Sequence, residues 1–156
     1  MNNQIKILIV IISISLVSCG YKPLNYNSNF KIVDIQSSGD SKINFILKNK
    51  INRNHFNDDA INIIKLEINS NKNKIIKEKN IQNEITKYSL IISVKVIYYT
   101  NGQNNKREFN MSKSGSFTVA ANYSQTLTNE KNALDLLMNE IADDINRKLL
   151  IDLSDI

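Results

Sequence analysis

Residues Tyr88 to Tyr99 constrain the fold more than any other segment, because their side chains alternate in character along the chain. Five large side chains fall on one face: Leu90, Ile92, Val94, Val96 and Tyr98. Ser93 and Lys95 fall on the other face. An alternation of period two is typical of a strand that is buried on one side and exposed on the other. The chain must therefore form a sheet whose apolar side is covered by other elements.

The residues that follow predict an antiparallel partner for this strand. Thr100 to Lys106 contains Asn101 and Gly102, which are typical of a hairpin turn. In the return strand, one face carries Phe109, Met111, Gly115, Phe117, Val119 and Ala121. The opposite face carries Asn110, Ser112, Ser114, Ser116 and Thr118. We therefore expect long antiparallel strands with one solvent-facing side.

Two segments with helical spacing can cover the apolar side of this sheet. Gly39, Asp40 and Ser41 predict a turn that caps a helix reaching to about Arg53. The apolar residues of that helix are Ile43, Ile46, Leu47 and Ile51. Near the C-terminus, Thr128 can cap a second and longer helix. Its apolar stripe is formed by Leu134, Leu137, Met138, Ile141, Ile145 and Leu149.

Two further segments complete the predicted sheet. The first strand spans residues 30–35, with Phe30, Ile32 and Asp34 on one face and Val33 and Ile35 near the other. The next strand is Ile64 to Ile68, which the polar run Asn69 to Asn73 is expected to break before a further edge at Lys74 to Lys79. The order of elements predicts the α+β class, with two helices packed on one face of a mostly antiparallel four-stranded sheet.

The first eighteen residues differ in composition from the rest of the chain. Lys6 is followed by the apolar stretch Ile7 to Val17, which is typical of a secretory signal peptide. Eleven residues at about 1.5 Å each reach only about half of a ~30 Å hydrocarbon core. The segment is too short to remain as a membrane span, so residues 1–18 are interpreted as an export signal.

The residues around the end of this signal fit a lipoprotein. Leu16, Val17, Ser18 and Cys19 match a lipobox, in which cleavage between Ser18 and Cys19 leaves the cysteine as a lipidated N-terminus. Because Cys19 is the only cysteine, an ordinary secreted protein with a stray cysteine is the weaker interpretation. Gly20 stands where Asp commonly retains lipoproteins in the inner membrane. We therefore expect a lipid-anchored protein on the periplasmic side of the outer membrane.

The length of the mature chain allows one domain. Residues 19–29, which contain the only proline, Pro23, show no period and are predicted to be a lipidated tether. Residues 30–156 then form a single domain. Removal of Lys6 with the signal lowers the formal net charge of +5 by one. This mild basicity suits an anionic partner, but the dense basic patch of a nucleic-acid binder is missing.

The sequence contains no recognisable catalytic or metal-binding motif. His55 is the only histidine, so a zinc site would need carboxylates alone beside it. The adjacent acids Asp58 and Asp59, and Asp143 and Asp144, are expected to solvate a turn and a helix face. With four glycines in all, the chain has no Gly-rich phosphate loop. We therefore predict a non-enzymatic protein that uses no metal and no cofactor.

Basic residues on and near the predicted hairpin are the remaining candidates for binding. They are Lys95, Lys106, Arg107 and Lys113. They can meet the phosphates of a lipid or an acidic partner. Alternatively, they are solvated charges that protect strand edges from unwanted pairing. The nearby aromatic residues are expected to pack in the core or at an interface: Tyr98, Tyr99, Phe109, Phe117 and Tyr123.

Three stretches of the sequence carry a family resemblance. The first is the run Cys19, Gly20, Tyr21, Lys22, Pro23, Leu24. The second is Thr86, Lys87, Tyr88, which leads into the alternating strand, and the third is Asn122, Tyr123 and the Ser/Thr segment running into Ala133. Together they resemble the LPS-assembly lipoprotein family, LptE, especially its alphaproteobacterial branch. The departures are Lys87, where relatives tend to have Arg, and Ser124 and Gln125, where relatives more often have Ala.

The resemblance implies an αβ sandwich that plugs the LptD β-barrel, helps that barrel fold and handles lipopolysaccharide on its way to the cell surface. LptD and lipopolysaccharide are then the expected partners. By position alone, Lys106 and Arg107 are the candidate contacts to lipopolysaccharide or to the barrel. The alternative is a free-standing, periplasm-facing lipoprotein that binds a small lipid or apolar ligand. A lipid-anchored hydrolase would need an acid or base pair for which the sequence offers no candidate.

Overall fold

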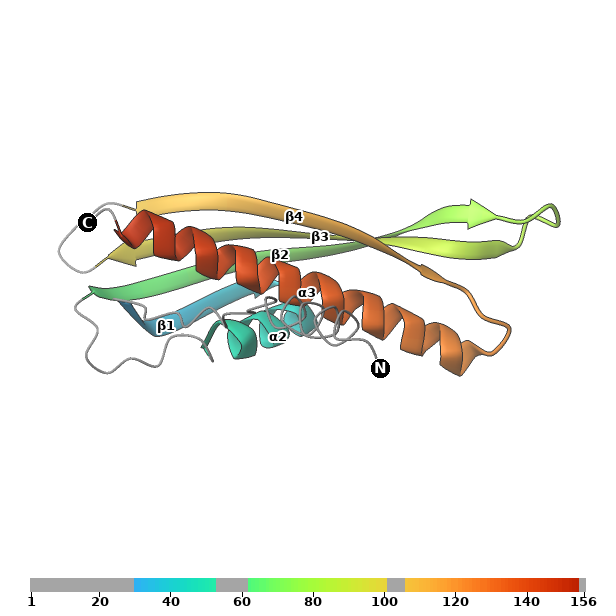
Figure 1. Ribbon diagram of the computed structural model, residues 1–156, viewed down its shortest axis with the longest axis horizontal. Coiled ribbons are helices and arrows are strands. Elements are labelled where there is room, and N and C mark those ends of the chain that lie inside the picture. The colour runs from blue at the N-terminus through green and yellow to red at the C-terminus, as the bar shows by residue number, and fades with distance from the viewer. Residues whose placement is uncertain (1–29, 53–61, 101–105, 155–156) are drawn as a thin grey trace, which may run out of the picture.

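The computed structural model describes residues 30–52, 62–100 and 106–154, and it places two helices on one face of a four-stranded sheet (Figure 1). The strands are β1 (Phe30–Gly39), β2 (Asn62–Lys79), β3 (Ile85–Thr100) and β4 (Lys106–Thr118). The helices are α2 (Ser41–Asn52) and α3 (Tyr123–Ser154). The predicted α+β class, with its two layers, is confirmed.

The strands lie across the sheet in the order in which they occur in the chain, β1-β2-β3-β4. β3 is antiparallel to both of its neighbours, whereas β1 and β2 are parallel. Parallel neighbours need a long crossover connection, and α2 lies in that connection. The sheet is therefore mostly antiparallel with one parallel pair.

The core lies between the sheet and the two helices. Each of the five predicted core residues of β3 is at most 2 % exposed: Leu90, Ile92, Val94, Val96 and Tyr98. The predicted stripe of α3 is also buried: Leu134, Leu137, Met138, Ile141, Ile145 and Leu149. Burial of an aliphatic side chain stabilises a fold by about 1.5–3 kcal/mol. The two clearest periodic patterns of the sequence are thus confirmed.

β1 departs from the predicted alternation. The register shifts at Val33, which bulges out of the strand and is 49 % exposed. After the bulge, Ile35 lies opposite Leu66 and is 9 % exposed, whereas Asp34 is exposed. The prediction that Ile35 lies on the face opposite Phe30 is wrong, because the extra residue returns the later side chains to the core side.

β2 continues through the polar run that the sequence predicts as a break. Asn69 to Asn73 remains paired with β3, with Ser70 opposite Val94. β1 ends opposite Ser70, so the rest of β2 has a strand on one side only. The predicted break is wrong, because pairing with a long apolar neighbour overrides the local composition. Lys74 to Lys79 is the end of this one strand and not a separate edge.

The turn between β1 and α2 has the predicted chemistry. Asp40 Oδ1 accepts hydrogen bonds of 3.0 Å from the backbone N–H groups of Lys42 and Ile43, as an N-cap does. Gly39 has φ 91°, which is the left-handed region that favours glycine. The Asp40 N–H then donates to the Ser70 carbonyl at 3.0 Å. The predicted cap is confirmed, and it also joins α2 to β2.

A buried polar contact reinforces this turn. The Ser70 hydroxyl donates to Asn44 Oδ1 at 2.8 Å, and Asn44 Nδ2 donates to the Ser38 carbonyl at 2.9 Å. Asn44 and Ser70 are both buried. Because buried polar groups are costly without partners, these two residues satisfy each other and fix where α2 lies against the sheet.

α3 begins earlier than the sequence predicts. Asn122 Oδ1 accepts a 2.9 Å hydrogen bond from the Ser124 N–H at the start of the helix. Thr128 lies inside the helix, where its hydroxyl donates to the Ser124 carbonyl at 3.1 Å. The prediction of Thr128 as the cap is wrong, because Asn122 occupies that role six residues earlier.

β4 also differs from its prediction at its C-terminal end. It ends at Thr118, so Val119 and Ala121 follow the strand and do not belong to it. The predicted turn at Asn101 and Gly102 lies outside the described residues, although β3 and β4 pair as an antiparallel hairpin would. Within the described ranges, neither helix has both the length and the apolar character that crossing a membrane requires.

Candidate functional site

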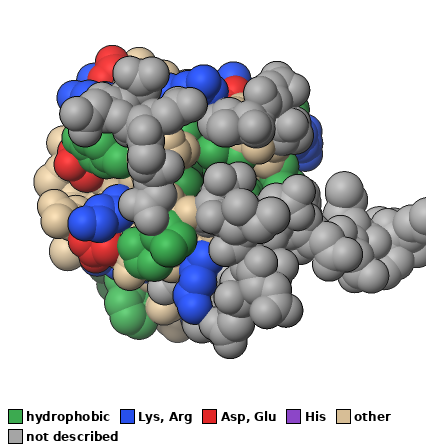
Figure 2. Space-filling view, turned by 90° about the vertical axis from the view of Figure 1, so that its left-hand side faces the viewer, with side chains coloured by type: hydrophobic (Ala, Val, Ile, Leu, Met, Phe, Trp, Pro, Cys, Tyr) green, Lys and Arg blue, Asp and Glu red, His purple; other side chains and the backbone are tan. Residues whose placement is uncertain are grey.

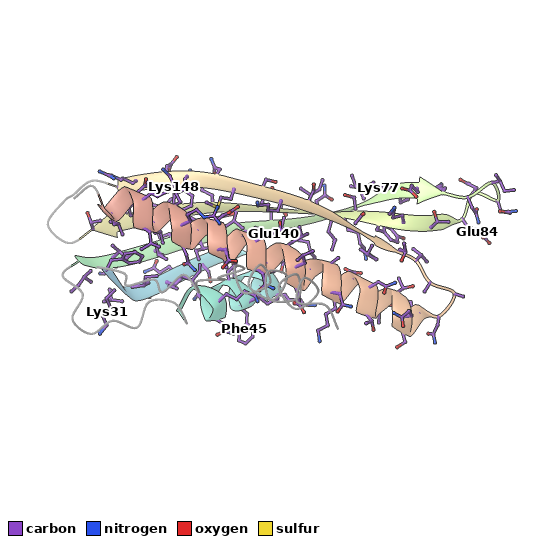
Figure 3. The ribbon with its side chains drawn as sticks, viewed as in Figure 1. Lys31, Phe45, Lys77, Glu84, Glu140 and Lys148 are labelled. Carbon is purple, nitrogen blue, oxygen red and sulfur yellow. The ribbon has the colours of Figure 1, made fainter. Side chains whose placement is uncertain are left out.

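The elongated sheet has two distinct ends. At the proximal end, Phe30 of β1 lies opposite Asn62 of β2, and Ile64 lies opposite Thr100 of β3. The start of β4 and the C-terminal end of α3 lie there too (Figure 1). At the distal end, residues 72–87 form a hairpin that extends beyond β1, here called the distal hairpin. In Figure 3, Lys148 lies near the proximal end, and Lys77 and Glu84 lie on the distal hairpin.

Lys106 and Arg107, the predicted contact residues, lie at the proximal end but do not act together. They are consecutive strand residues, so their side chains point to opposite faces of the sheet. Lys106 is exposed and has no ion pair with another described residue. Arg107 Nη1 donates to the backbone carbonyl of Asp152 at 3.2 Å. Lys106 is thus available to a ligand, whereas Arg107 also holds the end of α3.

The contacts of Asp152 join three elements at this end. Tyr98, which is fully buried, donates its hydroxyl to Asp152 Oδ2 at 2.9 Å. Lys148 Nζ donates to Oδ1 of the same carboxylate at 2.7 Å. Burial raises the pKa of Tyr98 above the ordinary 10.0, and the hydrogen bond to Asp152 adds to this effect. We call Tyr98, Arg107, Lys148 and Asp152 the Asp152 cluster; it ties the end of α3 to β3 and β4.

The other two predicted basic candidates pair with carboxylates on opposite sides of the sheet. Lys95 Nζ lies 3.0 Å from Glu108 on the face away from the helices. Lys113 Nζ lies 2.8 Å from Asp144 on α3, and this hydrogen bond raises the pKa of Lys113. Figure 2 views the proximal end and shows Lys and Arg side chains scattered around the rim, with Asp and Glu among them. The four cations therefore form no single patch.

The distal hairpin carries exposed apolar and basic side chains that the sequence interpretation did not single out. Ile75, Ile76 and Ile81 are 45 %, 50 % and 97 % exposed. Lys72 and Lys77 have no ion pair or side-chain hydrogen bond with another described residue. The sequence did hold a signal: this segment places isoleucines among five lysines, Lys72, Lys74, Lys77, Lys79 and Lys87.

Three of the five lysines are held by neighbouring side chains. Lys74 Nζ lies 3.0 Å from Glu130 of α3 and 5.1 Å from the centre of the Tyr88 ring. Lys87 Nζ lies 3.2 Å from Glu78. Lys79 Nζ donates to Asn83 Oδ1 at 2.9 Å. These contacts shape the hairpin, so the cations left for a ligand are Lys72 and Lys77.

Two shallow cavities lie side by side on the outer face, the side of the sheet away from α2 and α3. The first, of about 360 Å³, is lined by residues that include Gln36, Ser38, Glu67, Asn69, Lys95 and Ile97. The second, of about 330 Å³, is lined by residues that include Asn69, Asn71, Ser93, Lys95, Asn110 and Ser112. Because Asn69 and Lys95 line both, the two cavities adjoin, and we call them together the outer trough.

Several predicted site residues cannot be placed. Ser18, Cys19, His55, Asp58 and Asp59 all lie outside the described residues. Within the described ranges, no group of three His, Cys, Asp or Glu side chains is arranged to hold a metal ion. The lipid attachment at Cys19 and the cleavage between Ser18 and Cys19 therefore stay predictions.

Asp143 and Asp144 were predicted to solvate a helix face, and one of them, Asp144, forms ion pairs instead. Asp144 on α3 contacts Lys113 and, at 3.8 Å, Arg147. Its neighbour Asp143 is exposed. The contact with Lys113 joins α3 to β4 through an ion pair.

Similarity to known proteins decides the family. A model of the family described as LptE, lipopolysaccharide-assembly, matches residues 24–149. The chain belongs to the LptE family. The match runs from the segment before β1 into the last turns of α3, so it includes the whole sheet. No curated protein matches this LptE chain.

Solved structures with the same fold are distant in sequence from this LptE protein. Rare lipoprotein B from Shewanella oneidensis has a TM-score of 0.57 at 10 % identity, over 78 % of this chain and 97 % of that one. A lipoprotein from Caulobacter crescentus CB15 has a TM-score of 0.58 at 14 % identity, over 77 % and 90 %. Lipoprotein B from Nitrosomonas europaea has a TM-score of 0.52 at 12 % identity, over 85 % and 92 %. These likenesses show the shared fold.

Membership of the LptE family gives the chain a role in lipopolysaccharide assembly together with LptD. The family is a non-enzymatic component of lipopolysaccharide transport, and its lipoproteins are associated with the outer membrane. The predicted family resemblance is therefore confirmed.

Proposed function

We propose that this chain occupies the lumen of an LptD-type β-barrel as a plug, assists assembly of that barrel and takes part in inserting lipopolysaccharide into the outer leaflet. The length of the sheet is the observation that carries this proposal. β2 has 18 residues, which at about 3.3 Å each extend roughly 60 Å. The hydrocarbon core of a bilayer is about 30 Å thick. A plug of this length reaches from one side of the membrane to the other.

The direction of the plug follows from where the chain enters the sheet. A lipid on Cys19 would precede Phe30 by eleven residues, a reach of at most about 40 Å. The lipid would hold the proximal end near the periplasmic leaflet. The distal hairpin would then point away from the periplasm, through the barrel and toward the cell surface.

The chemistry of the two ends supports passage of an anionic amphiphile along the plug. Lys106, at the proximal end, can meet lipid phosphates as a charge-assisted donor. The distal hairpin carries both the exposed Ile81 and the cation of Lys77. A lipid with acyl chains and phosphates fits a surface that presents both kinds of group. The alternative, a small lipid in a cavity of this chain, has less support from the outer trough, because both of its cavities are shallow and open to solvent.

Co-purification tests the plug directly. The full lipidated chain, tagged at its C-terminus and expressed in its own outer membrane, is expected to bring down an LptD-type barrel in near-equal amount after gentle solubilisation. Mass spectrometry and band intensities measure the ratio. An unrelated outer-membrane lipoprotein with the same tag is the control. If the tagged chain arrives alone, the plug proposal fails and a free-standing lipoprotein takes its place.

Charge reversal tests the proposed contact at Lys106. Lys106→Glu is expected to weaken binding of lipopolysaccharide by about tenfold, because a lost contact to a charged group corresponds to about 1.5 kcal/mol. Lys42→Glu, an equal charge change on the helical layer, is the matched control. Arg107→Glu is a poorer probe, since it would also set a carboxylate against the Asp152 cluster. Equal binding of lipopolysaccharide by the Lys106→Glu and Lys42→Glu proteins would contradict the proposed contact at Lys106.

A further inference from the structure

β4 leaves one side of its backbone without a neighbouring strand. It is the last strand of the sheet, and among the described residues no strand lies beside it on the side away from β3 (Figure 1). A free edge of this kind is a template for pairing with another chain, so proteins commonly protect it with charged side chains, bulges or a covering segment. The presence or absence of such protection indicates whether the edge stays unpaired in the assembled protein.

The other free edge, on β2, has this protection. Beyond Ser70, β2 no longer has β1 beside it. The charged residues of this stretch are Lys72, Lys74, Lys77, Glu78 and Lys79. The register with β3 also shifts between Ile76 and Lys79, as it does at a β-bulge. Charged side chains and an irregular backbone together make this edge a poor template for a further strand.

The second part of β4 has neither kind of protection. Its pairing with β3 shows no register shift from Lys106 to Thr118. Between Asn110 and Thr118 the one charged side chain is that of Lys113, which is bound by Asp144 of α3. Its neighbours in this stretch are mostly small: Ser112, Ser114, Gly115 and Ser116. The edge of β4 is therefore regular and largely uncharged, which suits it to pairing.

The hydrogen bonds of β4 show which backbone groups point away from β3. The Val119 N–H donates to the Thr86 carbonyl at 2.9 Å. Because bonding alternates along an antiparallel strand, the odd-numbered residues of β4 bond to β3 and the even-numbered residues point outward. Thr118 agrees with this pattern, since its carbonyl accepts a 3.1 Å hydrogen bond from Asn129 Nδ2 of α3. The other outward N–H and carbonyl groups are those of Lys106, Glu108, Asn110, Ser112, Ser114 and Ser116.

The two faces of β4 define the side chains that an added strand would carry. On the helical side, Phe109 and Met111 pack against the core but are only partly buried. Apolar side chains of an added strand would cover the open flanks of these two residues. On the outer face, Ser112, Ser114 and Ser116 are exposed and suit polar neighbours. The edge therefore fits an extended segment whose residues alternate between apolar and polar.

We propose that the free edge of β4 binds an extended segment of the LptD-type barrel, which adds a strand to the sheet. This inference rests on the proposed function, in which the chain lies inside that barrel. The strands of a closed barrel wall already pair on both sides, so the bound segment is one that folds from the wall into the lumen. The exposed Lys106 at the start of β4 favours an acidic residue beside it in that segment. Backbone hydrogen bonds give such a contact its affinity, and the alternating side chains give its specificity.

Photo-crosslinking of the full lipidated chain in its own outer membrane tests the pairing. A photoreactive amino acid replaces Asn110, Ser112 or Ser114, whose side chains lie on the same face two residues apart. Mass spectrometry is expected to find all three attached to one barrel segment, with the attachment moving by about two residues at each step. Attachment to a second copy of this chain, to scattered positions of the barrel wall, or to no barrel residue overturns the proposal.

The protected edge of β2 provides the matched control for these cross-links. Asn71 and Asn73 also lie two residues apart on the outer face of one strand. A photoreactive amino acid at either position is expected to reach the barrel wall without a regular step. The same two-residue step from β2 as from β4 would contradict the proposal, because the step would then report closeness to the wall and not strand pairing.

Proline substitution tests the backbone contacts separately. Ser114→Pro removes an outward N–H but no hydrogen bond to β3, so proline is tolerable at this edge position. The amount of co-purified barrel is expected to fall about fivefold, which corresponds to the loss of about one hydrogen bond. Ser114→Ala keeps the N–H and is expected to retain the wild-type amount. Ser112→Pro is a second variant in case circular dichroism shows that Ser114→Pro does not fold. A folded proline variant that brings down as much barrel as Ser114→Ala overturns the proposal.

The outcomes separate this inference from the proposed function. A wild-type chain that brings down the barrel but gives no stepwise cross-links from β4 supports the plug and contradicts the pairing. A plug is surrounded by the barrel wall, so labels at Lys42 on the helical layer and at Asn73 on the outer face should also reach the barrel. Stepwise cross-links from β4 with none from Lys42 or Asn73 support the pairing and contradict the plug. A chain that brings down no barrel contradicts both.

Discussion

Gly39→Ala is expected to lower the free energy of unfolding by about 3 kcal/mol or more, the sum of a strained backbone and a broken hydrogen bond. Gly39 has φ 91°, where a side chain is disfavoured. A Cβ at this position would lie 1.9 Å from the Ser70 carbonyl oxygen, which is backbone and cannot rotate away. The same oxygen accepts the Asp40 N–H, so relief of the clash would break the contact between β2 and the start of α2.

Gly115→Ala is the matched control for this substitution. A Cβ on Gly115 would meet Leu137 Cδ2 at 3.3 Å, which is the flexible end of a side chain. A loss of about 1 kcal/mol is therefore expected from tighter packing. Urea unfolding followed by circular dichroism measures both variants. Equal losses for the two glycines would contradict the special role of Gly39, and a domain stability of about 5–15 kcal/mol makes the expected difference measurable.

The second large effect is expected at Tyr98. Tyr98→Ala should cost about 3–5 kcal/mol, as other large aromatic truncations in cores do, because Tyr98 is fully buried. Tyr98→Phe should cost only about 1–2 kcal/mol, since it keeps the ring and removes one hydrogen bond to a charged group, Asp152. Thermal unfolding at neutral pH measures both. If the Ala and Phe variants lose the same stability, the hydroxyl and not the ring anchors the end of α3.

The pH dependence of Tyr98→Phe provides a separate check. Burial raises the pKa of Tyr98 above 10.0, so the folded state keeps the phenol proton more tightly than the unfolded state does. Stability from this group is therefore complete below about pH 10 and is lost as pH rises through the raised pKa. Tyr98→Phe should show a smaller fall in stability above about pH 10 than wild-type protein. An identical alkaline fall in both proteins would contradict the assignment.

The elements that could be predicted from the sequence are those whose pattern is local. β3 alternates over its whole length, and both helices show their buried stripes, because each pattern repeats within a few residues. β1 was predicted with the wrong face for Ile35, since a bulge at Val33 depends on pairing with β2 and leaves no local signal. The predicted break at the polar run of β2 was wrong for a related reason. Pairing with β3 holds this run in the strand conformation.

The candidate site was less predictable, because it depends on which side chains meet across the fold. Arg107 contacts the carbonyl of Asp152, and Lys113 contacts Asp144, and both partners lie far along the chain on α3. Charge pattern alone identified the bases but not these partners. The outer trough is lined by residues of all four strands, so no single segment of the sequence predicts it.

The long pairing of β1 with β2 bears on how the domain carries mechanical load. Nine residue pairs join β1 to β2, starting at Phe30, where the chain enters the sheet. A force applied through the preceding chain pulls β1 along its own axis, so the ladder is sheared and its hydrogen bonds share the load. A force across the strand axis would instead break the hydrogen bonds of the ladder one at a time. The predicted lipidated tether would therefore pull β1 along its own axis, against all nine of these residue pairs at once.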